Sequence, residues 1–231
     1  VWEDATTKYG FGHRRTYLLG KGLDSVMNYP FKNAVLDFVK GKPAEQAAGE
    51  ILSICEHYPA PALNTALNFL STHDTERALT VIADEPANGR GREWQSGRNV
   101  SGEAYEEGML RLRMAYAIIY TLPGLPCLYY GDEIGMQGYR DPFNRGYYCW
   151  DSHEERLKPV LAQLAHLRHS CEAFRTGALR VLRAEGGVLH YQRVGATETA
   201  EIIVNRSEHI IVEPLASGKH TEVNPMGFTI V

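Results

Sequence analysis

The chain has 231 residues, of which 44% are hydrophobic and 23% are charged, proportions that are ordinary for a globular protein. Its formal net charge of −4 gives no electrostatic reason to expect a nucleic-acid partner or an anionic membrane surface. We expect no membrane partner, because no apolar run approaches the roughly 20 residues needed to span a bilayer, and the N-terminus lacks the basic and apolar regions of a signal peptide.

Most of the chain predicts alternating strands and helices. Residues 23–30 predict a short strand that ends at Pro30, and the consecutive apolar residues at 67–71 and 126–133 predict two strands buried on both faces. The polar, glycine-rich segment 84–103 predicts a long loop. Helical spacing of apolar residues predicts helices at 31–41, 43–58, 104–124 and 152–177. Alternation of this kind favours an α/β fold with a parallel sheet.

The periodicity changes after Gly177. Residues 178–231 contain short alternating strands broken by Gly and Asn, which indicates a small antiparallel sheet. We therefore expect two domains, 1–177 and 178–231. Three strand–helix units are too few to close an eight-stranded barrel. Either the parallel sheet is open, or the first part of a barrel is missing.

The adjacent pair His73-Asp74 follows the predicted strand 67–71. One interpretation is structural, because Ser71-x-x-Asp74 fits a capping box and Asp74 or Thr75 is placed to cap the next helix. The functional interpretation is an imidazole and a carboxylate that face a polar ligand at a strand end. A metal site that includes Glu76 is weaker, since no second histidine stands at helical spacing.

Several motifs, in the right order, carry a resemblance to a known family. "FLSTHDTER" resembles the F-L-x-N-H-D-x-x-R motif on the seventh strand of the alpha-amylase family of glycoside hydrolases, and "GLPCLYYGDEIGM" resembles that family's eighth-strand motif. "LDSVMNYPF" and "GYRDPFNRGYYCWD" resemble the neopullulanase, cyclomaltodextrinase and maltogenic-amylase group. The resemblance implies strands six to eight of a (β/α)8 TIM barrel with their helices in 1–177, and a small antiparallel β-sandwich domain in 178–231.

The resemblance also bears on the N-terminus. In the family the fifth strand ends in a segment like G-E-V-W-E-D-A, whose first Glu is the general acid, whereas this chain begins "VWEDA" without a Met. The matching Glu would precede Val1, Glu3 does not match it, and the nucleophilic Asp would also lie upstream. The expectation is a C-terminal fragment of a retaining alpha-glucan hydrolase, inactive by itself, whose parent acts on maltooligosaccharides, cyclodextrins or pullulan.

The same resemblance implies roles for two catalytic residues. Asp74 would be the carboxylate that hydrogen-bonds the 2- and 3-hydroxyls of a glucose ring near the oxocarbenium-like transition state. His73 would donate a hydrogen bond to a neighbouring hydroxyl. The usual Asn before this pair is Thr72 here, so we expect altered supporting hydrogen bonds without loss of function.

Three further residues are expected to bind substrate. The resemblance places Asp141 and Arg145 against a glucose unit on the non-reducing side of the cleavage point, although an ordinary ion pair within a loop would explain the same spacing. Trp2, Tyr129 and Trp150 are candidates for stacking on sugar rings, but large aromatic residues are more often core. Trp2 is preferred because it follows the catalytic-acid position.

The neighbouring acids Asp132 and Glu133 are interpreted as architectural, because adjacent residues on a strand point to opposite faces. No cofactor and no metal are expected. The four cysteines include no C-x-x-C, which predicts free thiols and a cytoplasmic protein.

The exposed edge of a partial barrel predicts a homo-oligomer. Two alternative functions stay open at this point: a non-catalytic carbohydrate-binding or structural module, and a transferase of the same superfamily.

Overall fold

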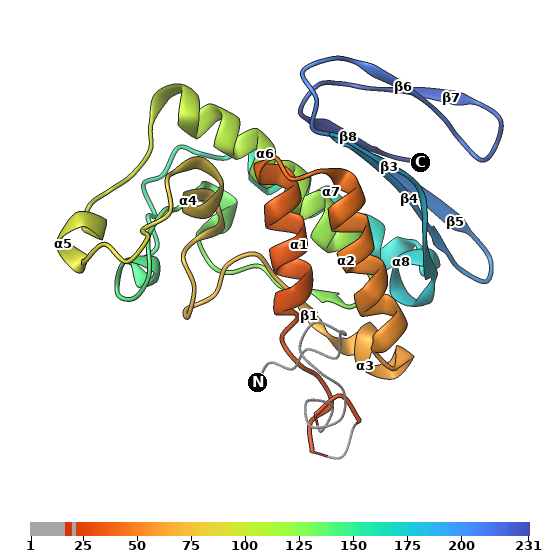
Figure 1. Cartoon of the computed structure of the whole chain (residues 1–231), viewed down its shortest axis with the longest axis horizontal. Coiled ribbons are helices and arrows are strands. Elements are labelled where there is room, and N and C mark those ends of the chain that lie inside the picture. Colours follow the sequence, from red (N-terminus) through yellow and green to blue (C-terminus); the bar gives the residue numbers. More distant parts are fainter. Residues whose placement is uncertain (1–16, 20–21) are drawn as a thin grey trace.

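The computed structural model describes residues 17–19 and 22–231. A helical body lies beside an antiparallel sheet (Figure 1). The helices are α1 (Tyr29–Lys40), α2 (Ala44–His57), α3 (Ala60–Thr65), α4 (Ala78–Ala83), α5 (Arg92–Gln95), α6 (Gly102–Thr121), α7 (Leu157–Ser170) and α8 (Glu172–Thr176), with the 3-10 turns η3 (Asp132–Ile134) and η4 (Phe143–Arg145). The strands are β1 (Leu67–Asn68), β2 (Leu125–Pro126), β3 (Ala178–Glu185), β4 (Val188–Val194), β5 (Thr199–Asn205), β6 (Ile211–Pro214), β7 (His220–Val223) and β8 (Gly227–Ile230).

Three segments that are distant in sequence run side by side in the same direction. β1 pairs in parallel with β2, with Leu67 opposite Leu125. On the other side of β1, Met27 forms an isolated parallel bridge with Leu67. The order is therefore Met27, β1, β2, and the carboxyl ends of the three segments meet at one edge.

The predicted strand at 126–133 is wrong. Regular pairing stops at Pro126, and the chain then turns at Gly131, whose φ of 85° is left-handed, into η3. Leu128 and Tyr130 are partly exposed instead of buried on both faces. The apolar run was misleading because its tyrosines pack around a buried arginine, described below.

The predicted helices at 31–41, 43–58 and 104–124 are confirmed as α1, α2 and α6, with ends that differ by one to three residues. The Asn28 side chain caps α1 by accepting a hydrogen bond from the Phe31 N–H. Three predictions need correction. The strand predicted at 23–30 is reduced to an isolated bridge at Met27, because α1 already begins at Tyr29. The helix at 152–177 is two helices separated by the extended residue Cys171, and the loop at 84–103 contains α5.

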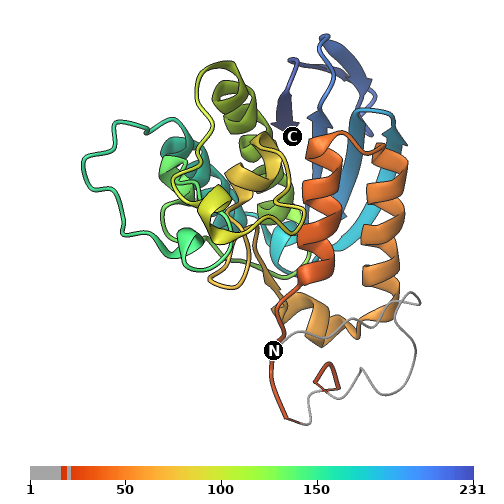
Figure 2. The ribbon, with the colours of Figure 1, turned by 60° about the vertical axis from the view of Figure 1, so that its left-hand side comes forward.

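Helix α6 lies at the centre of the core. Six consecutive residues, 114–119, are fully buried, so this stretch is enclosed on every side. It packs against α1, α4 and α7, and also against β5 and β8 of the antiparallel sheet. Helix α2 packs against β3 and β4 of the same sheet, and α1 packs against α2 (Figure 1 and Figure 2). One continuous core therefore joins the helical body to the strands.

The antiparallel sheet begins at Ala178 and has the order β3-β4-β5-β8, while β6 and β7 form a separate hairpin. Arg193 of β4 ties this sheet to the helices. Its fully buried guanidinium donates to the Thr121 carbonyl at 2.6 Å and to the Gly177 carbonyl at 2.8 and 3.1 Å. Burial lowers the pKa of Arg193 to about 10, so the group is still charged at neutral pH.

A buried polar cluster joins the β6–β7 hairpin to the larger sheet. His190 Nε2 lies 3.1 Å from Glu201, and its Nδ1 lies 3.5 Å from Glu213 of β6. Arg183 of β3 forms an ion pair with the same Glu213. The hairpin is therefore held by charge-assisted contacts as well as by apolar packing.

Among the described residues, no helix combines the length and the apolar character needed to cross a membrane. All four cysteines are free thiols; Cys127 and Cys149 are exposed, and Cys55 and Cys171 are partly buried.

Candidate functional site

The loop that joins β1 to α4 carries the His73-Asp74 pair. The two side chains are each 57% exposed, and His73 Nε2 lies 3.2 Å from the Asp74 carboxylate. Both residues follow the carboxyl end of β1, which is paired in parallel with β2. They face solvent at the edge of the sheet where parallel α/β folds place their ligands.

The capping-box interpretation of this loop is wrong. Ser71 Oγ accepts a hydrogen bond from the Ala78 N–H at 2.8 Å, and the Asp74 N–H donates to Thr72 Oγ1 at 3.1 Å. The residue that precedes α4 is Arg77. Asp74 therefore caps no helix, and its carboxylate is turned outward.

Asp141 and Arg145 reach the same place from a distant segment. The Arg145 Nε lies 2.9 Å from Asp141 and donates to the His73 carbonyl at 3.1 Å. Its Nη2 lies 3.8 Å from Asp74. The ion pair expected of an ordinary loop is present, but the same guanidinium also touches the pair after β1. We call His73, Asp74, Asp141 and Arg145 the polar cluster.

The polar cluster places two carboxylates, a guanidinium and an imidazole side by side in solvent. Such a set can accept and donate charge-assisted hydrogen bonds to adjacent hydroxyl groups of one ligand. Within residues 17–19 and 22–231, no group of three or more His, Cys, Asp or Glu side chains is arranged to hold a metal ion. Glu76 turns instead toward Arg140, at 3.5 Å. Trp2 lies outside the described residues.

Thr72 stands where the family has Asn. Its hydroxyl accepts from the Asp74 N–H and lies 3.3 Å from the Thr75 hydroxyl, so it shapes the turn that carries Asp74.

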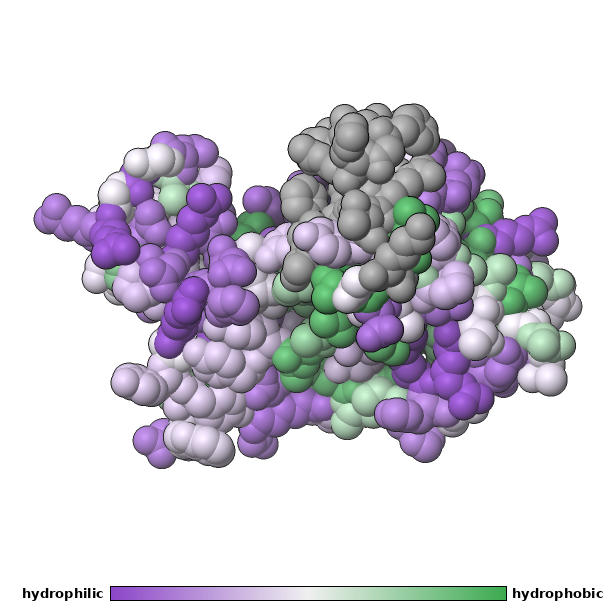
Figure 3. Space-filling model, turned by 90° about the horizontal axis from the view of Figure 1, so that it is seen from below, coloured by the Kyte–Doolittle hydropathy of each residue, from purple (hydrophilic) through white to green (hydrophobic). Residues whose placement is uncertain are grey.

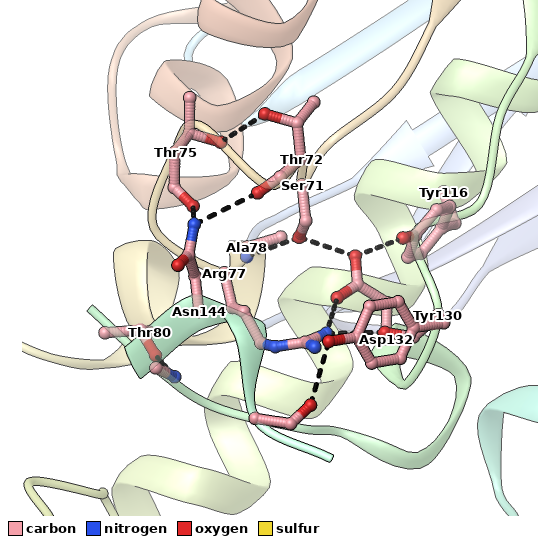
Figure 4. A network of polar contacts seen from close by, with 12 residues as sticks. Ser71, Thr72, Thr75, Arg77, Ala78, Thr80, Tyr116, Tyr130, Asp132 and Asn144 are labelled. Atoms are coloured by element: carbon pink, nitrogen blue, oxygen red, sulfur yellow. Dashed lines mark hydrogen bonds and ion pairs between the residues drawn. The ribbon is translucent and has the colours of Figure 1, made fainter. Parts of the chain in front are cut away.

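A buried carboxylate, Asp132, organises the loop between β1 and α4 through Ser71 and Arg77 (Figure 4). Asp132 is 1% exposed and accepts hydrogen bonds from the Ser71 and Tyr116 hydroxyls, each at 2.6 Å, and from Arg77 Nη1 at 3.2 Å. Burial raises the pKa of Asp132 to about 6 although these three donors oppose the rise, so it is ionised at neutral pH. The architectural interpretation of Asp132 is confirmed, but the reason is burial within η3 and not alternation along a strand.

Arg77 is the cation of this network, and it is fully buried. Its guanidinium lies 4.7 and 4.8 Å from the ring centroids of Tyr129 and Tyr130, and Nη1 also donates to the Tyr130 carbonyl at 2.6 Å. Its Nε and Nη2 have no hydrogen-bond partner among the described residues, so the two aromatic rings are their main neighbours. Tyr129 therefore packs against the arginine that holds Asp132.

No role was expected of Asn144 from the sequence, but its side chain holds the backbone carbonyls of the same loop. This fully buried side chain donates from Nδ2 to the carbonyls of His73 at 2.9 Å, Thr75 at 2.8 Å and Thr72 at 3.3 Å. The one signal in the sequence is its place inside "DPFNR", between Asp141 and Arg145.

We expect Asn144→Ala to lower the free energy of unfolding by about 2 kcal/mol, because it leaves the Thr75 carbonyl without its donor and removes one of the two donors to the carbonyls of His73 and Thr72. Urea denaturation measures this change. The control is Asn33→Ala, which removes an exposed amide from α1 and should change stability by less than about 0.5 kcal/mol. Equal stability of the two variants would contradict the anchoring role.

Comparisons with known proteins identify the family. The family described as alpha amylase, catalytic domain, matches residues 8–165. An amylopullulanase from Thermoanaerobacter thermohydrosulfuricus is 34% identical over 76% of this chain and 12% of its own length. Neopullulanase 2 from Thermoactinomyces vulgaris is 30% identical over 95% of this chain and 34% of its own length.

Solved structures give the same result. The ligand-free cyclic alpha-maltosyl-(1-->6)-maltose hydrolase from Arthrobacter globiformis matches with a TM-score of 0.78 and 26% identity, over 93% of this chain and 45% of that one. The chain thus spans about a third or less of the curated relatives described above. On the evidence of the matched domain and these relatives, this chain belongs to the alpha-amylase family of glycoside hydrolases.

Proposed function

We propose that this chain is the sugar-gripping part of a retaining alpha-glucan hydrolase that acts on maltooligosaccharides, cyclodextrins or pullulan-type substrates. The observation that carries the proposal is the polar cluster itself. His73 and Asp74 follow β1, Asp141 and Arg145 come from a segment almost 70 residues later, and all four side chains meet at one solvent-facing edge. Family membership supplies the class of reaction.

In this proposal, the segment that contains Met27 is strand six of a (β/α)8 barrel, and β1 and β2 are strands seven and eight. Residues 1–177 form the C-terminal part of that barrel. The antiparallel strands in 178–231 form the small β-sandwich domain. The parallel order Met27, β1, β2 and the start of antiparallel pairing at Ala178 support this division.

Asp74 accepts hydrogen bonds from two neighbouring hydroxyls of a glucose ring. Its negative charge stabilises that ring as the anomeric carbon becomes cationic. His73 donates to an adjacent hydroxyl, and Arg145 holds Asp141 and the loop carbonyl of His73 in place. The nucleophile and the general acid belong to upstream segments, so the 231-residue chain binds glucans without cleaving them.

Calorimetric titration of the chain with maltotriose tests the proposal. We expect weak binding of maltotriose, no comparable binding of the β-linked cellotriose, and no release of reducing sugar. Absence of maltotriose binding would overturn the assignment of the polar cluster. Hydrolysis at the rate of a whole amylase would overturn the assignment of nucleophile and acid to upstream segments.

We also propose that the chain forms a homo-oligomer through its partial-barrel face, and that it works in the cytoplasm, where its four thiols stay reduced. Supporting the first point, apolar side chains gather in the middle of the face shown in Figure 3. A pocket of about 380 Å³ is lined by residues that include Leu19, Leu23, Val26 and Pro61. Sedimentation equilibrium that returns only monomer would contradict the oligomer.

A further inference from the structure

Two aromatic side chains are unusually exposed in the segment between η4 and α7. Tyr147 is 99% exposed and Trp150 is 86% exposed, so of the two interpretations of Trp150, stacking candidate or core residue, the core interpretation is excluded. In Figure 2 this segment forms a loop that stands out from the body of the molecule. Large exposed aromatic side chains gathered in one place mark binding surfaces in many proteins.

The loop has defined anchors. The Tyr130 hydroxyl donates to the Gly146 carbonyl at 2.8 Å. This hydrogen bond ties the start of the loop to the tyrosine whose ring packs on Arg77. The Ser152 N–H donates to the Cys149 carbonyl at 3.2 Å and closes a turn around Trp150. The rings of Tyr148 and Trp150 lie 4.7 Å apart at 58°. These contacts hold the Trp150 ring in a defined position while it stays exposed.

We call residues 146–156, the segment between η4 and α7, the aromatic loop. It continues directly from Arg145 of the polar cluster. Arg145 contacts Asp74 and Asp141, and Tyr147 follows it by two residues. A chain extends at most about 3.5 Å per residue, so Trp150 lies within roughly 18 Å of Arg145. A few linked sugar rings cover that distance.

We propose that Tyr147 and Trp150, braced by Tyr148, form a stacking surface for a further glucose ring of the same alpha-glucan that the polar cluster binds. This inference rests on the function proposed above. A pyranose ring presents hydroxyls at its edge, which suit charged groups, and C–H bonds on its faces, which suit an aromatic plane. The polar cluster suits the hydroxyls at the edge of a sugar ring, and the aromatic loop suits its C–H faces.

The surroundings favour a sugar over a second protein surface. Asp151, His153 and Glu155 are exposed immediately beyond Trp150, so the apolar patch is small and rimmed by polar groups. Two aromatic side chains supply about 300–500 Å², whereas a stable protein interface buries about 800 Å² on each partner.

Calorimetric titration with maltoheptaose and maltotriose tests the proposal on the full chain. We expect Trp150→Ala to weaken maltoheptaose binding about tenfold and maltotriose binding less, because stacking of one ring is worth about that factor. Trp150→Phe keeps an aromatic plane and should stay within about threefold of the wild type. Ile210→Ala, which removes an exposed apolar side chain from the far hairpin, is the matched control and should change nothing.

The outcomes separate the two proposals. If Trp150→Ala binds maltoheptaose as the wild type does while Asp74→Asn is weakened, the stacking surface is overturned and the proposed function stands. If the wild-type chain binds neither sugar, both are overturned. If Trp150→Ala changes self-association in sedimentation but not sugar affinity, the surface is a protein interface and the stacking proposal is overturned.

Discussion

Arg77→Ala is expected to lower the free energy of unfolding by about 3–5 kcal/mol, since it leaves a buried carboxylate without its cation. Arg77 is the one cation that hydrogen-bonds Asp132 among the described residues, and both side chains are essentially inaccessible to solvent. The substitution also removes the planar group that lies against the rings of both Tyr129 and Tyr130. Chemical denaturation at neutral pH measures the loss.

The destabilisation should depend on pH in a definite direction. Burial already raises the pKa of Asp132 to about 6, and loss of Arg77 raises it further because an opposing positive charge is gone. A carboxyl whose pKa is higher in the folded state than its unfolded value of about 3.9 favours folding at low pH, and that advantage is lost as pH rises through the folded pKa. The gap in stability between the variant and the wild type should therefore widen above pH 6.

A double variant provides the control. Arg77→Met combined with Asp132→Asn removes both charges and keeps similar volumes, so it should recover much of the stability that Arg77→Ala loses. Arg77→Met alone separates the two causes, because it keeps most of the volume but leaves Asp132 unpaired. If Arg77→Met alone were as stable as the double variant at every pH, cavity formation, and not the unpaired carboxylate, would control the stability of this site.

The helices were predictable because their apolar residues repeat at helical spacing over three or more turns, as in α1, α2 and α6. The strand ends were not predictable in the same way. In residues 126–133 the apolar character comes partly from tyrosines that surround Arg77 instead of pairing in a sheet. A local pattern cannot distinguish an aromatic side chain buried between strands from one that stacks on a guanidinium.

In the candidate site, too, some residues were predictable from the sequence and others were not. His73, Asp74, Asp141 and Arg145 were found because motifs point to them, and the structure brings them together. Asn144 was missed since its partners are backbone carbonyls about 70 residues away, which leave no trace in side-chain identity. Contacts from a side chain to a distant backbone become visible only once the chain is folded.

Asp74→Asn is expected to have the largest functional effect. In the isolated chain it should weaken maltotriose binding by about 10- to 100-fold, because a hydrogen bond to a charged group contributes about 1.5–3 kcal/mol. In a protein that joins this segment to an upstream barrel half, kcat should fall by about 10²- to 10³-fold or more. The amide keeps the size of the side chain but removes the negative charge that stabilises the oxocarbenium-like ring.

The matched control for Asp74→Asn is Glu76→Gln, which removes a carboxylate two residues away that turns toward Arg140 and not into the polar cluster. Glu76→Gln should keep both maltotriose affinity and kcat within about threefold of the wild type, since losing a partly exposed ion pair is worth about 0–1 kcal/mol.

Because the Asp74 side chain is exposed and caps no helix, Asp74→Asn should leave the unfolding midpoint almost unchanged, so its effect on sugar binding can be separated from an effect on folding. Parallel losses in the two variants would mean that the negative potential of the loop matters and the position of Asp74 does not. A loss confined to Asp74→Asn would assign the ring-stabilising role to the one carboxylate that lies beside both His73 and Arg145.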